Sequence, residues 1–304
     1  MNIQIKNRMK PCLCVSLAIM LIALIMTLTG HGLNLGVDFT GGTLMTYNMG
    51  GEYSTDDIQA VLTENGISDA QIARVGSDNE VQIRISDQDN TDELRSALES
   101  KLSEKYPNIA YVDISRVGAI AGRDLINNAV KSVSVAALLM LIYIAIRFDF
   151  FSGLAAIIGL LHDVLIMLSI SVLLRGFMRV ETTYIAALLT IVGYSINNTI
   201  IIFDRIRENS HKPQLRSQSR DEIVNLSVSE SLSRTLNTTI TTLITIVVLY
   251  ILGVDSIKLF SLPLIIGILA GTYSANLING YGWAALKDAF EKSQKNKSTA
   301  KAKA

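Results

Sequence analysis

Charged residues and cysteines are both scarce in this sequence of 304 residues. Only 18% of the residues are Asp, Glu, Lys or Arg, while 49% are hydrophobic. This balance argues against an ordinary soluble protein and favours a chain that crosses a membrane several times. The two cysteines, Cys12 and Cys14, are separated by one residue at the start of an apolar run. Because such neighbours seldom form a good disulfide, we interpret them as packing residues at a membrane edge.

Sequence motifs of common enzymes and of nucleic-acid-binding proteins are also missing. The sequence has no nucleophile elbow, P-loop, dinucleotide fingerprint or HExxH motif, and no basic stretch interleaved with aromatic residues. Gly41-Gly42 precedes a predicted strand rather than a helix, so it is not a phosphate-binding loop. His162-Asp163 is a single pair, whereas zinc needs three or four ligands. None of these patterns therefore indicates a common enzyme class, a cofactor site or a metal site.

Six apolar runs are long enough to cross a bilayer. The first, residues 13–30, follows three basic residues and lacks a convincing signal-peptide cleavage site, so we expect it to remain as a helix. The other five lie near 124–147, 151–174, 182–203, 233–252 and 257–286. Each has about 20 residues or more, enough for roughly 30 Å at about 1.5 Å per residue. Small residues at Ala155/Gly159 and Gly267/Gly271 predict close helix contacts.

The segment between the first two runs has the pattern of a soluble domain. Residues 43–48 alternate like a strand, and Ser54 then begins a helix that ends at Gly66. Residues 70–76 and 80–86 predict a hairpin with a turn between them, a second helix begins at Asn90, and residues 109–117 alternate again. The order β-α-β-β-α-β predicts a ferredoxin-like α+β domain.

The charges of this domain and of the rest of the chain have opposite signs. Residues 31–123 contain 15 acidic and 7 basic residues, and the remainder contains 12 acidic and 20 basic residues. Because short cytoplasmic loops are rich in Lys and Arg, we expect both termini in the cytoplasm and the acidic domain outside. The predicted parts are residues 1–33, the N-terminus and first span; 34–123, the outer domain; 124–286, a five-helix bundle with a cytoplasmic loop at 204–232; and 287–304, a basic tail with a disordered end.

Five polar residues within or beside the spans are candidates for an ion pathway, because polar groups at membrane depth need partners in protein or water. They are Asp163, Asn197, Asn198, Asp204 and Arg234. Asp163 is near the middle of its span, with His162 as a candidate partner. Asn197 and Asn198 could equally be interhelical contacts, Asp204 a solvated helix end, and Arg234 a side chain that reaches the cytoplasmic surface. Arg234 is also a candidate partner of Asp204.

Several of these residues belong to motifs that resemble the SecF family of bacterial protein-export subunits. The resemblance covers nearly the whole chain. It is most specific in Gly36-Val-Asp-Phe-Thr-Gly-Gly-Thr43, which includes Asp38, Phe39, Thr40, Gly41 and Gly42, and in Val192-Gly-Tyr-Ser-Ile-Asn197, which includes Gly193, Tyr194 and Ser195. Further matches are Leu161-His-Asp163, Phe203-Asp-Arg-Ile-Arg-Glu-Asn209 and Ser233-Arg-Thr235.

The resemblance implies a polytopic protein of the bacterial cell membrane that is built like half of an RND-type transporter. It implies SecD as the other half, with SecYEG, the translocating preprotein and YajC as further partners. It also implies use of the ion-motive force, carried by H+ or Na+, in late steps of protein export. A subunit of this kind is not an enzyme and needs no cofactor other than the coupling ion.

One residue departs from the family pattern. Many members have Asp where this chain has Asn198, and that carboxylate is assigned to proton passage. An amide does not ionise near neutral pH. Three explanations remain open: the membrane carboxylate of SecD couples the ion, Asp163 or Asp204 compensates, or the ion is Na+, for which an amide oxygen can be a ligand.

Two rival functions remain compatible with the sequence. One is an RND-type exporter of small molecules or lipids that works as a homodimer. The other is a purely structural assembly factor, for which substitutions of the membrane polar residues would have no effect.

Overall fold

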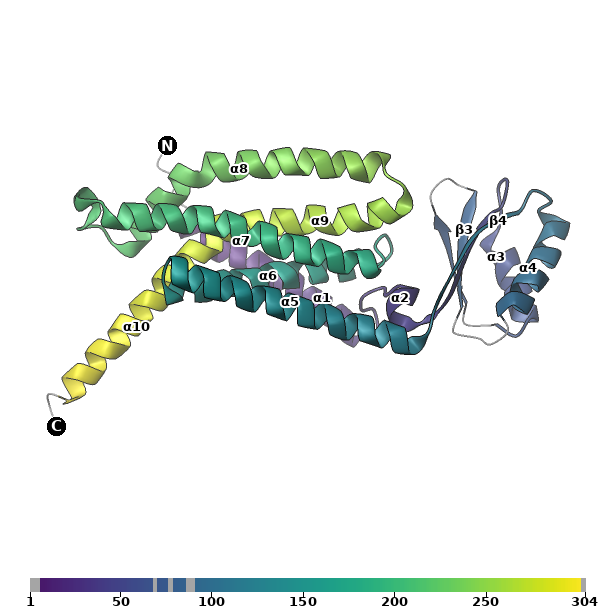
Figure 1. The fold of residues 1–304 in the computed structure, drawn as a ribbon, viewed down its shortest axis with the longest axis horizontal. Coiled ribbons are helices and arrows are strands. Elements are labelled where there is room, and N and C mark those ends of the chain that lie inside the picture. The colour runs from purple at the N-terminus through teal and green to yellow at the C-terminus, as the bar shows by residue number, and fades with distance from the viewer. Residues whose placement is uncertain (1–5, 68–69, 76–78, 86–90, 302–304) are drawn as a thin grey trace.

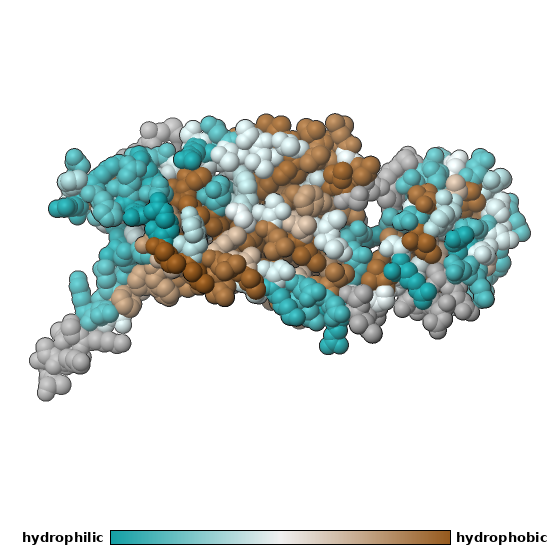
Figure 2. Space-filling view, in the orientation of Figure 1, coloured by the Kyte–Doolittle hydropathy of each residue, from teal (hydrophilic) through white to brown (hydrophobic). Residues whose placement is uncertain are grey.

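The computed structural model describes residues 6–67, 70–75, 79–85 and 91–301. In this part of the chain a bundle of long helices and a small sheet domain lie end to end along the long axis of the molecule (Figure 1). Among the described residues, six helices are long and apolar enough to cross a membrane, as the sequence predicts. Figure 2 shows hydrophobic residues over the middle of the bundle and hydrophilic residues at its far end and on the sheet domain.

The bundle is formed by helices whose bounds largely follow the predicted spans. They are α1 (Lys6–Leu28), α5 (Ala119–Arg147), α6 (Phe150–Leu173), α7 (Thr182–His211), α8 (Arg220–Leu252) and α9 (Asp255–Ser274), which continues through η2 (Ala275–Asn279) into α10 (Gly280–Lys301). The element η2 is a short π-helix. Helices α7 and α9 share the most extensive contact, with α6 and α8 beside them.

One prediction about the polar segments at the far end of the bundle was wrong. The expected loop 204–232 is mostly helical, because α7 continues to His211 and α8 begins at Arg220 with a complete capping box of Ser219 and Glu222. The basic tail is helical to Lys301, and residues 302–304, at the end that was expected to be disordered, lie outside the described residues. Arg220 forms ion pairs with Asp288 and Glu291, which join the start of α8 to α10.

The close helix contacts predicted from small residues are confirmed. A Cβ added at Gly267 would lie 2.0 Å from the side chain of Ile191, and one at Gly271 would lie 3.0 Å from Ser195. At Gly159 an added Cβ would lie 2.0 Å from the side chain of Asn279. These three glycines therefore let α6, α7 and the α9–η2 segment approach one another closely.

The sheet domain has the predicted order of elements. They are β1 (Gly42–Asn48), α3 (Thr55–Glu64), β2 (Gln71–Val75), β3 (Glu80–Ile85), α4 (Thr91–Lys105) and β4 (Ala110–Val117). The strands form one antiparallel sheet in the order β2-β3-β1-β4, with Met45 opposite Ile83 of β3 and Ile114 of β4. Ser54 caps α3 as predicted. Residues 76–78 of the expected hairpin and Asn90, the expected start of the second helix, lie outside the described residues.

The core of this domain is apolar and lies between the sheet and its two helices. Alternate residues of β1 and β3, among them Met45, Tyr47 and Ile83, pack against Ile58 of α3 and Leu98 of α4. In Figure 1 the sheet lies between the bundle and these helices, so its second face is turned toward the bundle.

Candidate functional site

The bundle buries one carboxylate near the middle of a membrane-spanning helix. Asp163 is 0% exposed and lies about 20 Å from the start of α6, by helical rise. Its Oδ2 accepts hydrogen bonds from Ser195 of α7 at 2.5 Å and from Ser274 of α9 at 2.8 Å. Its Oδ1 is 3.0 Å from Nδ1 of His162, which confirms the predicted partner. Three helices therefore meet at this carboxylate, and hydroxyl and imidazole groups compensate its burial.

The two amides of α7 have different surroundings. Asn198 is fully buried, and its Nδ2 is 3.4 Å from Oγ1 of Thr272 on α9. Asn197 is exposed on the outer surface of the bundle, on the same face as Gly193 and Asp204. Their spacing of seven residues explains why Asn197 and Asp204 share a helix face. Asn198 therefore belongs to the interior of this chain and Asn197 does not. A role of either amide in an ion pathway stays a prediction.

A cluster of hydroxyl and amide groups continues from Asn198 toward α8. Thr272 is 2.8 Å from Thr239 of α8, which accepts a hydrogen bond from the hydroxyl of Tyr194 at 3.1 Å. Thr235 of α8 donates to Oδ1 of Asn276 at 3.1 Å. We define the polar core as Asp163 of α6 together with the polar side chains of α7, α8, α9 and η2 that surround it or continue from it. Its members are Asp163, Tyr194, Ser195, Asn198, Thr199, Thr235, Thr239, Thr272, Ser274, Asn276 and Asn279.

The π-helix η2 contributes two buried amides to the polar core. Its wider turn places Asn276 and Asn279 in the interior, 5% and 2% exposed. Asn279 donates to Thr199 of α7 at 2.7 Å. Short π-helical turns within α-helices are frequent at functional sites. Here the turn adds polar groups to the same interior region that Asp163 occupies.

Two buried oxygens of the polar core have no hydrogen-bond partner within the described protein. They are Oδ1 of Asn198 and Oδ1 of Asn279. An unpaired buried acceptor costs about 1–3 kcal/mol. Amide oxygens are also ligands for hard cations. Among the described residues, however, no group of three or more His, Cys, Asp and Glu side chains is placed to hold a metal ion.

Asp204 and Arg234 lie outside the polar core. Asp204 is exposed at the far end of the bundle, and its ion pair is with Arg147 of α5, at 3.7 Å. Its predicted pairing with Arg234 is therefore wrong. Arg234, which is at the start of the predicted span 233–252, lies well inside the longer helix α8 and is exposed beside the buried Thr235. Polar residues one and two turns further along α8, Thr238 and Thr241, continue its face.

The motif around Gly36 joins the first span to the start of α7. Oδ2 of Asp38 accepts hydrogen bonds from the backbone N–H of Thr182 at 2.8 Å and from its hydroxyl at 2.6 Å. Asp38 thus caps the N-terminus of α7 from a distant part of the sequence. The N–H of Gly36 donates to the carbonyl of Val180, and a Cβ at Gly36 would lie 2.8 Å from the Glu181 side chain.

The rest of this motif turns the chain from the bundle into the sheet. Phe39 and Thr40 complete the short helix α2 (Val37–Thr40), and Gly41 and Gly42 follow with φ of 73° and 122°. Residues with a Cβ rarely adopt such angles, which explains the glycine pair. A Cβ at Gly122 of α5 would lie 2.6 Å from the carbonyl oxygen of Phe39, so α2 also packs closely on α5.

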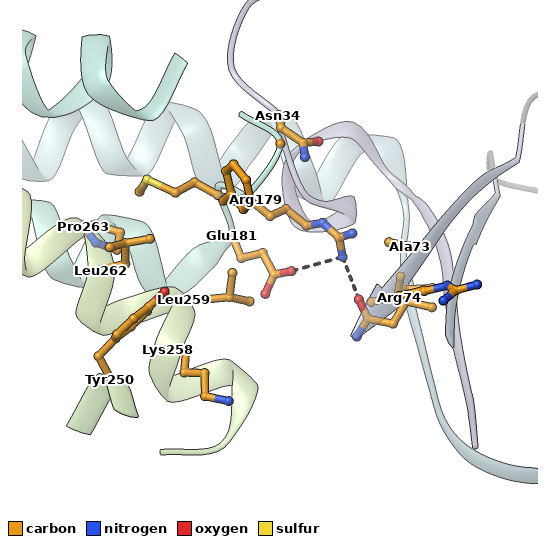
Figure 3. A pocket seen from close by; sticks show the side chains of 15 residues that line it. Asn34, Ala73, Arg74, Arg179, Glu181, Tyr250, Lys258, Leu259, Leu262 and Pro263 are labelled. Carbon is orange, nitrogen blue, oxygen red and sulfur yellow. Dashed lines mark hydrogen bonds and ion pairs between the residues drawn. The ribbon is translucent and has the colours of Figure 1, made fainter. Parts of the chain in front are cut away.

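A cavity of about 370 Å³ lies between the sheet domain and the bundle (Figure 3). Arg179, in the loop between α6 and α7, donates to Oε1 of Gln82 on β3 at 2.7 Å and lies 3.8 Å from Glu181. Burial raises the pKa of Glu181, and the positive charge of Arg179 opposes that rise. The Arg179–Gln82 contact adds a second connection between the start of α7 and the sheet.

Sequence reasoning missed much of the polar core. It did not single out Ser274, Asn276 or Asn279, nor Ser16, which contacts His162 at 2.9 Å. Polar residues within the last apolar run were the available signal, because Ser274, Asn276 and Asn279 interrupt it at membrane depth. It placed Asp38, Tyr194 and Ser195 in family motifs without predicting their contacts.

Comparison with known proteins relates these features to a family. Residues 97–289 match the family described as "Protein export membrane protein SecD/SecF, C-terminal", and residues 27–49 match the "SecD/SecF GG Motif". The chain is 35% identical to the protein translocase subunit SecF of Haemophilus influenzae, over 86% of this chain and 78% of that protein. It is 38% identical to SecF of Desulfurispirillum indicum, over 86% of this chain and 84% of that protein.

A solved structure shows the same arrangement of the chain. The crystal structure of SecDF, a translocon-associated membrane protein from Thermus thermophilus, matches with a TM-score of 0.80 and 35% identity. The match covers 93% of this chain but only 38% of the SecDF chain. From the family matches over more than half of the sequence and from the similarity to curated SecF proteins, we conclude that this multi-pass membrane protein belongs to the SecF family of protein translocase subunits.

Proposed function

We propose that this chain is the SecF half of a SecD–SecF complex that uses an ion gradient to assist late steps of protein export through SecYEG. The observation that carries the proposal is Asp163, a carboxylate fully buried among three membrane helices and connected through α7 to the sheet domain. The chain is a transport component rather than an enzyme, as its SecF relatives are. In this proposal the translocating preprotein is the cargo, and YajC is a further candidate partner.

The outer surface of α7 and α8 supports association with SecD. Thr190, Gly193 and Asn197 of α7 are exposed, and α8 exposes Arg234, Asn237, Thr241 and Thr245 along one face. Lipid offers polar groups at this depth no hydrogen-bond partner. A second protein half would cover them, and the SecDF chain is long enough to contain one, because this chain matches only 38% of it.

Asp163 is the best-placed candidate for the titrating group in this chain. Of the carboxylates considered from the sequence, Asp204 is exposed and paired with Arg147, whereas Asp163 is enclosed by the polar core. A proton that binds Asp163 would remove a buried charge and weaken its attraction for the hydroxyls of Ser195 and Ser274. The three helices that meet there would then repack. Na+ remains the alternative ion, since the amide oxygens of Asn198 and Asn279 are unpaired.

Helix α7 would carry this movement to the outer domain. Ser195 binds Asp163 near the middle of α7, and Asp38 caps the end of the same helix. Displacement of α7 therefore acts directly on the motif that leads into β1. We place the sheet domain outside the cell and both termini in the cytoplasm, because the basic residues gather at the far end of the bundle. The strand order β2-β3-β1-β4 supports a ferredoxin-like description of this domain.

The proposal is tested by measuring secretion in cells depleted of their own SecF and supplied with this chain, with the proton and sodium gradients collapsed separately. We expect secretion to fall when the proton gradient is collapsed and to persist when only the sodium gradient is removed. The opposite result would identify Na+ as the coupling ion. Secretion that is insensitive to both gradients would contradict an ion-driven role.

A rival function, a homodimeric exporter of small molecules or lipids, makes a different prediction about composition. Purification of the tagged chain from its native membrane should recover a SecD-like protein. Recovery of the chain with no SecD-like partner, as a dimer of itself, would favour the exporter.

A further inference from the structure

A chain of hydrogen bonds leads from Asp163 to the surface of the bundle, away from the rest of the polar core. His162 contacts Asp163 through Nδ1 at 3.0 Å and contacts Oγ of Ser16, on α1, through Nε2 at 2.9 Å. Oγ of Ser16 is in turn 3.0 Å from the hydroxyl of Tyr273 on α9. The rings of His162 and Tyr273 also lie beside each other, with centroids 5.7 Å apart. Four side chains from three helices thus form one continuous path.

Every intermediate member of this path can both accept and donate a proton. Imidazole does so through its two ring nitrogens, and serine and tyrosine through their hydroxyls. Ser16 is 3% exposed and Asp163 is 0% exposed, so bulk water does not compete along the inner part of the path. The titratable groups that face it are Asp163 and His162 on α6, Tyr273 on α9, and Cys12 on α1, which contacts Tyr273.

The path ends at Tyr273, which lines a surface groove of about 420 Å³ between α1, α6 and α9. Aliphatic side chains form most of its wall, and Cys12, Ser16 and Tyr273 are its polar members. Cys12 lies only about 9 Å along α1 from the first residue of that helix, Lys6, at the end of the bundle that we place in the cytoplasm. The groove therefore connects Tyr273 with the neighbourhood of the inner membrane surface.

We propose that His162, Ser16 and Tyr273 form a relay that releases the proton of Asp163 toward the cytoplasm. The proton on Oδ1 of Asp163 passes to Nδ1 of His162, while the proton on Nε2 passes to Oγ of Ser16. The proton of Ser16 passes to the oxygen of Tyr273, and the hydroxyl proton of Tyr273 passes to a water molecule. Asp163 ends as a carboxylate and the water as hydronium, and each intermediate member has gained and lost one proton. This inference rests on the proposed role of Asp163 as the proton-carrying group.

The relay is tested by proton uptake into vesicles that contain the purified complex of this chain with its SecD-like partner. Ser16→Ala and Tyr273→Phe each remove one hydroxyl of the path, and His162→Asn keeps a donor to Asp163 but has no second ring nitrogen. We expect each to slow proton uptake at least tenfold, since positioned proton transfer contributes about 10²–10⁴ to rates. The solvent deuterium isotope effect of the wild type should be lost in Ser16→Ala and restored by Ser16→Thr, which keeps the hydroxyl.

A matched pair elsewhere in the bundle separates proton transfer from packing. Ser171 and Tyr184 are buried and lie 2.9 Å apart, but neither contacts Asp163. Ser171→Ala and Tyr184→Phe should transport protons at the wild-type rate. Equal losses in this control pair, or a loss in Ser16→Ala that Ser16→Thr does not restore, would overturn the relay.

The relay and the proposed function can fail separately. If Asp163→Asn abolishes proton uptake while Ser16→Ala and Tyr273→Phe leave it unchanged, Asp163 carries the proton but releases it by another route. If Asp163→Asn itself transports normally, the proposed function fails, and the relay fails with it.

Discussion

The two halves of this molecule distribute polar and apolar residues in opposite ways. The sheet domain buries Met45, Tyr47 and Leu98 and turns its charged residues outward, as soluble domains do. The helix bundle exposes Leu, Ile and Val along α1, α5 and α8, and Figure 2 shows hydrophobic residues over its middle. It buries a carboxylate, amides and hydroxyls. Apolar burial explains the stability of the first region. The polar interior of the second is costly to form, so we attribute it to function.

Removal of buried apolar volume distinguishes the two halves most strongly. Leu98→Ala leaves a cavity in a core where Leu98 is 0% exposed, and we expect the free energy of unfolding of the sheet domain to fall by about 2–5 kcal/mol. Leu139 of α5 is 62% exposed, so Leu139→Ala should change stability by less than about 0.5 kcal/mol. The stability of both variants is measured by thermal unfolding of the full chain in detergent, with proteolysis used to detect unfolding of the sheet domain. Comparable losses in the two variants would contradict the contrast.

The junction between the halves should show a smaller effect on stability and a clear effect on transport. Asp38→Ala removes the cap from α7, which we expect to cost about 1 kcal/mol of stability. Secretion by the depleted cells should fall further than this loss of stability explains, because movement of α7 would no longer reach the motif around Gly36 through Asp38. Thr40→Ala is the control, since Thr40 lies in the same motif without capping α7. Equal secretion by both variants would argue that Asp38 does not transmit movement.

The next largest effect is expected at the exposed polar face of α8, on association with the SecD-like partner. Arg234→Ala should weaken association with the SecD-like partner by about 1 kcal/mol, roughly fivefold, as interhelical polar contacts in membranes do, and should impair secretion. Co-purification with the partner measures the association. Arg216→Ala, in the connection between α7 and α8, is a matched loss of charge outside the membrane. Normal secretion with a stably assembled complex would count against a role for Arg234.

The smallest expected effect is a pH dependence of the sheet domain. Hydrogen bonds from Lys105 and Tyr106 lower the pKa of Asp57. Because the folded pKa lies below the unfolded value of about 3.8, this stabilisation is complete above that value and is lost as the pH falls through the folded pKa. Asp57→Asn should therefore reduce the acid dependence of unfolding below about pH 4 and leave the bundle unaffected. An unchanged acid profile would show that the exposed contact contributes nothing measurable.

The same contrast explains how much could be predicted from the sequence. Periodicity and length gave the six spans and the β-α-β-β-α-β order, because these depend on residues close in sequence. The contact between His162 and Asp163 was also predicted, since they are neighbours. Ser274, in contrast, is 111 residues from Asp163, and Ser16 is 146 residues from His162. No local pattern connects such residues, so the polar core required the structure.

The remaining differences between the sequence-based predictions and the structure concern where helices end and which way their residues face. Helices α7 and α8 extend beyond their apolar runs, because the polar residues there are also compatible with a helix and Ser219 caps the start of α8. The adjacent Asn197 and Asn198 were taken together, although neighbours on a helix point about 100° apart. One of them therefore faces the interior and the other the outer surface.

The most direct test of the account compares Asp163 with Asn198 in proton uptake by the purified complex in vesicles. Asp163→Asn keeps the shape of the side chain but cannot ionise, so we expect uptake to fall at least tenfold while the complex remains assembled. Asn198→Ala should be milder, with a loss of no more than about threefold, because the amide does not carry the proton. Complete loss in Asn198→Ala together with normal uptake in Asp163→Asn would contradict the account and would make the amide itself the ion-binding group.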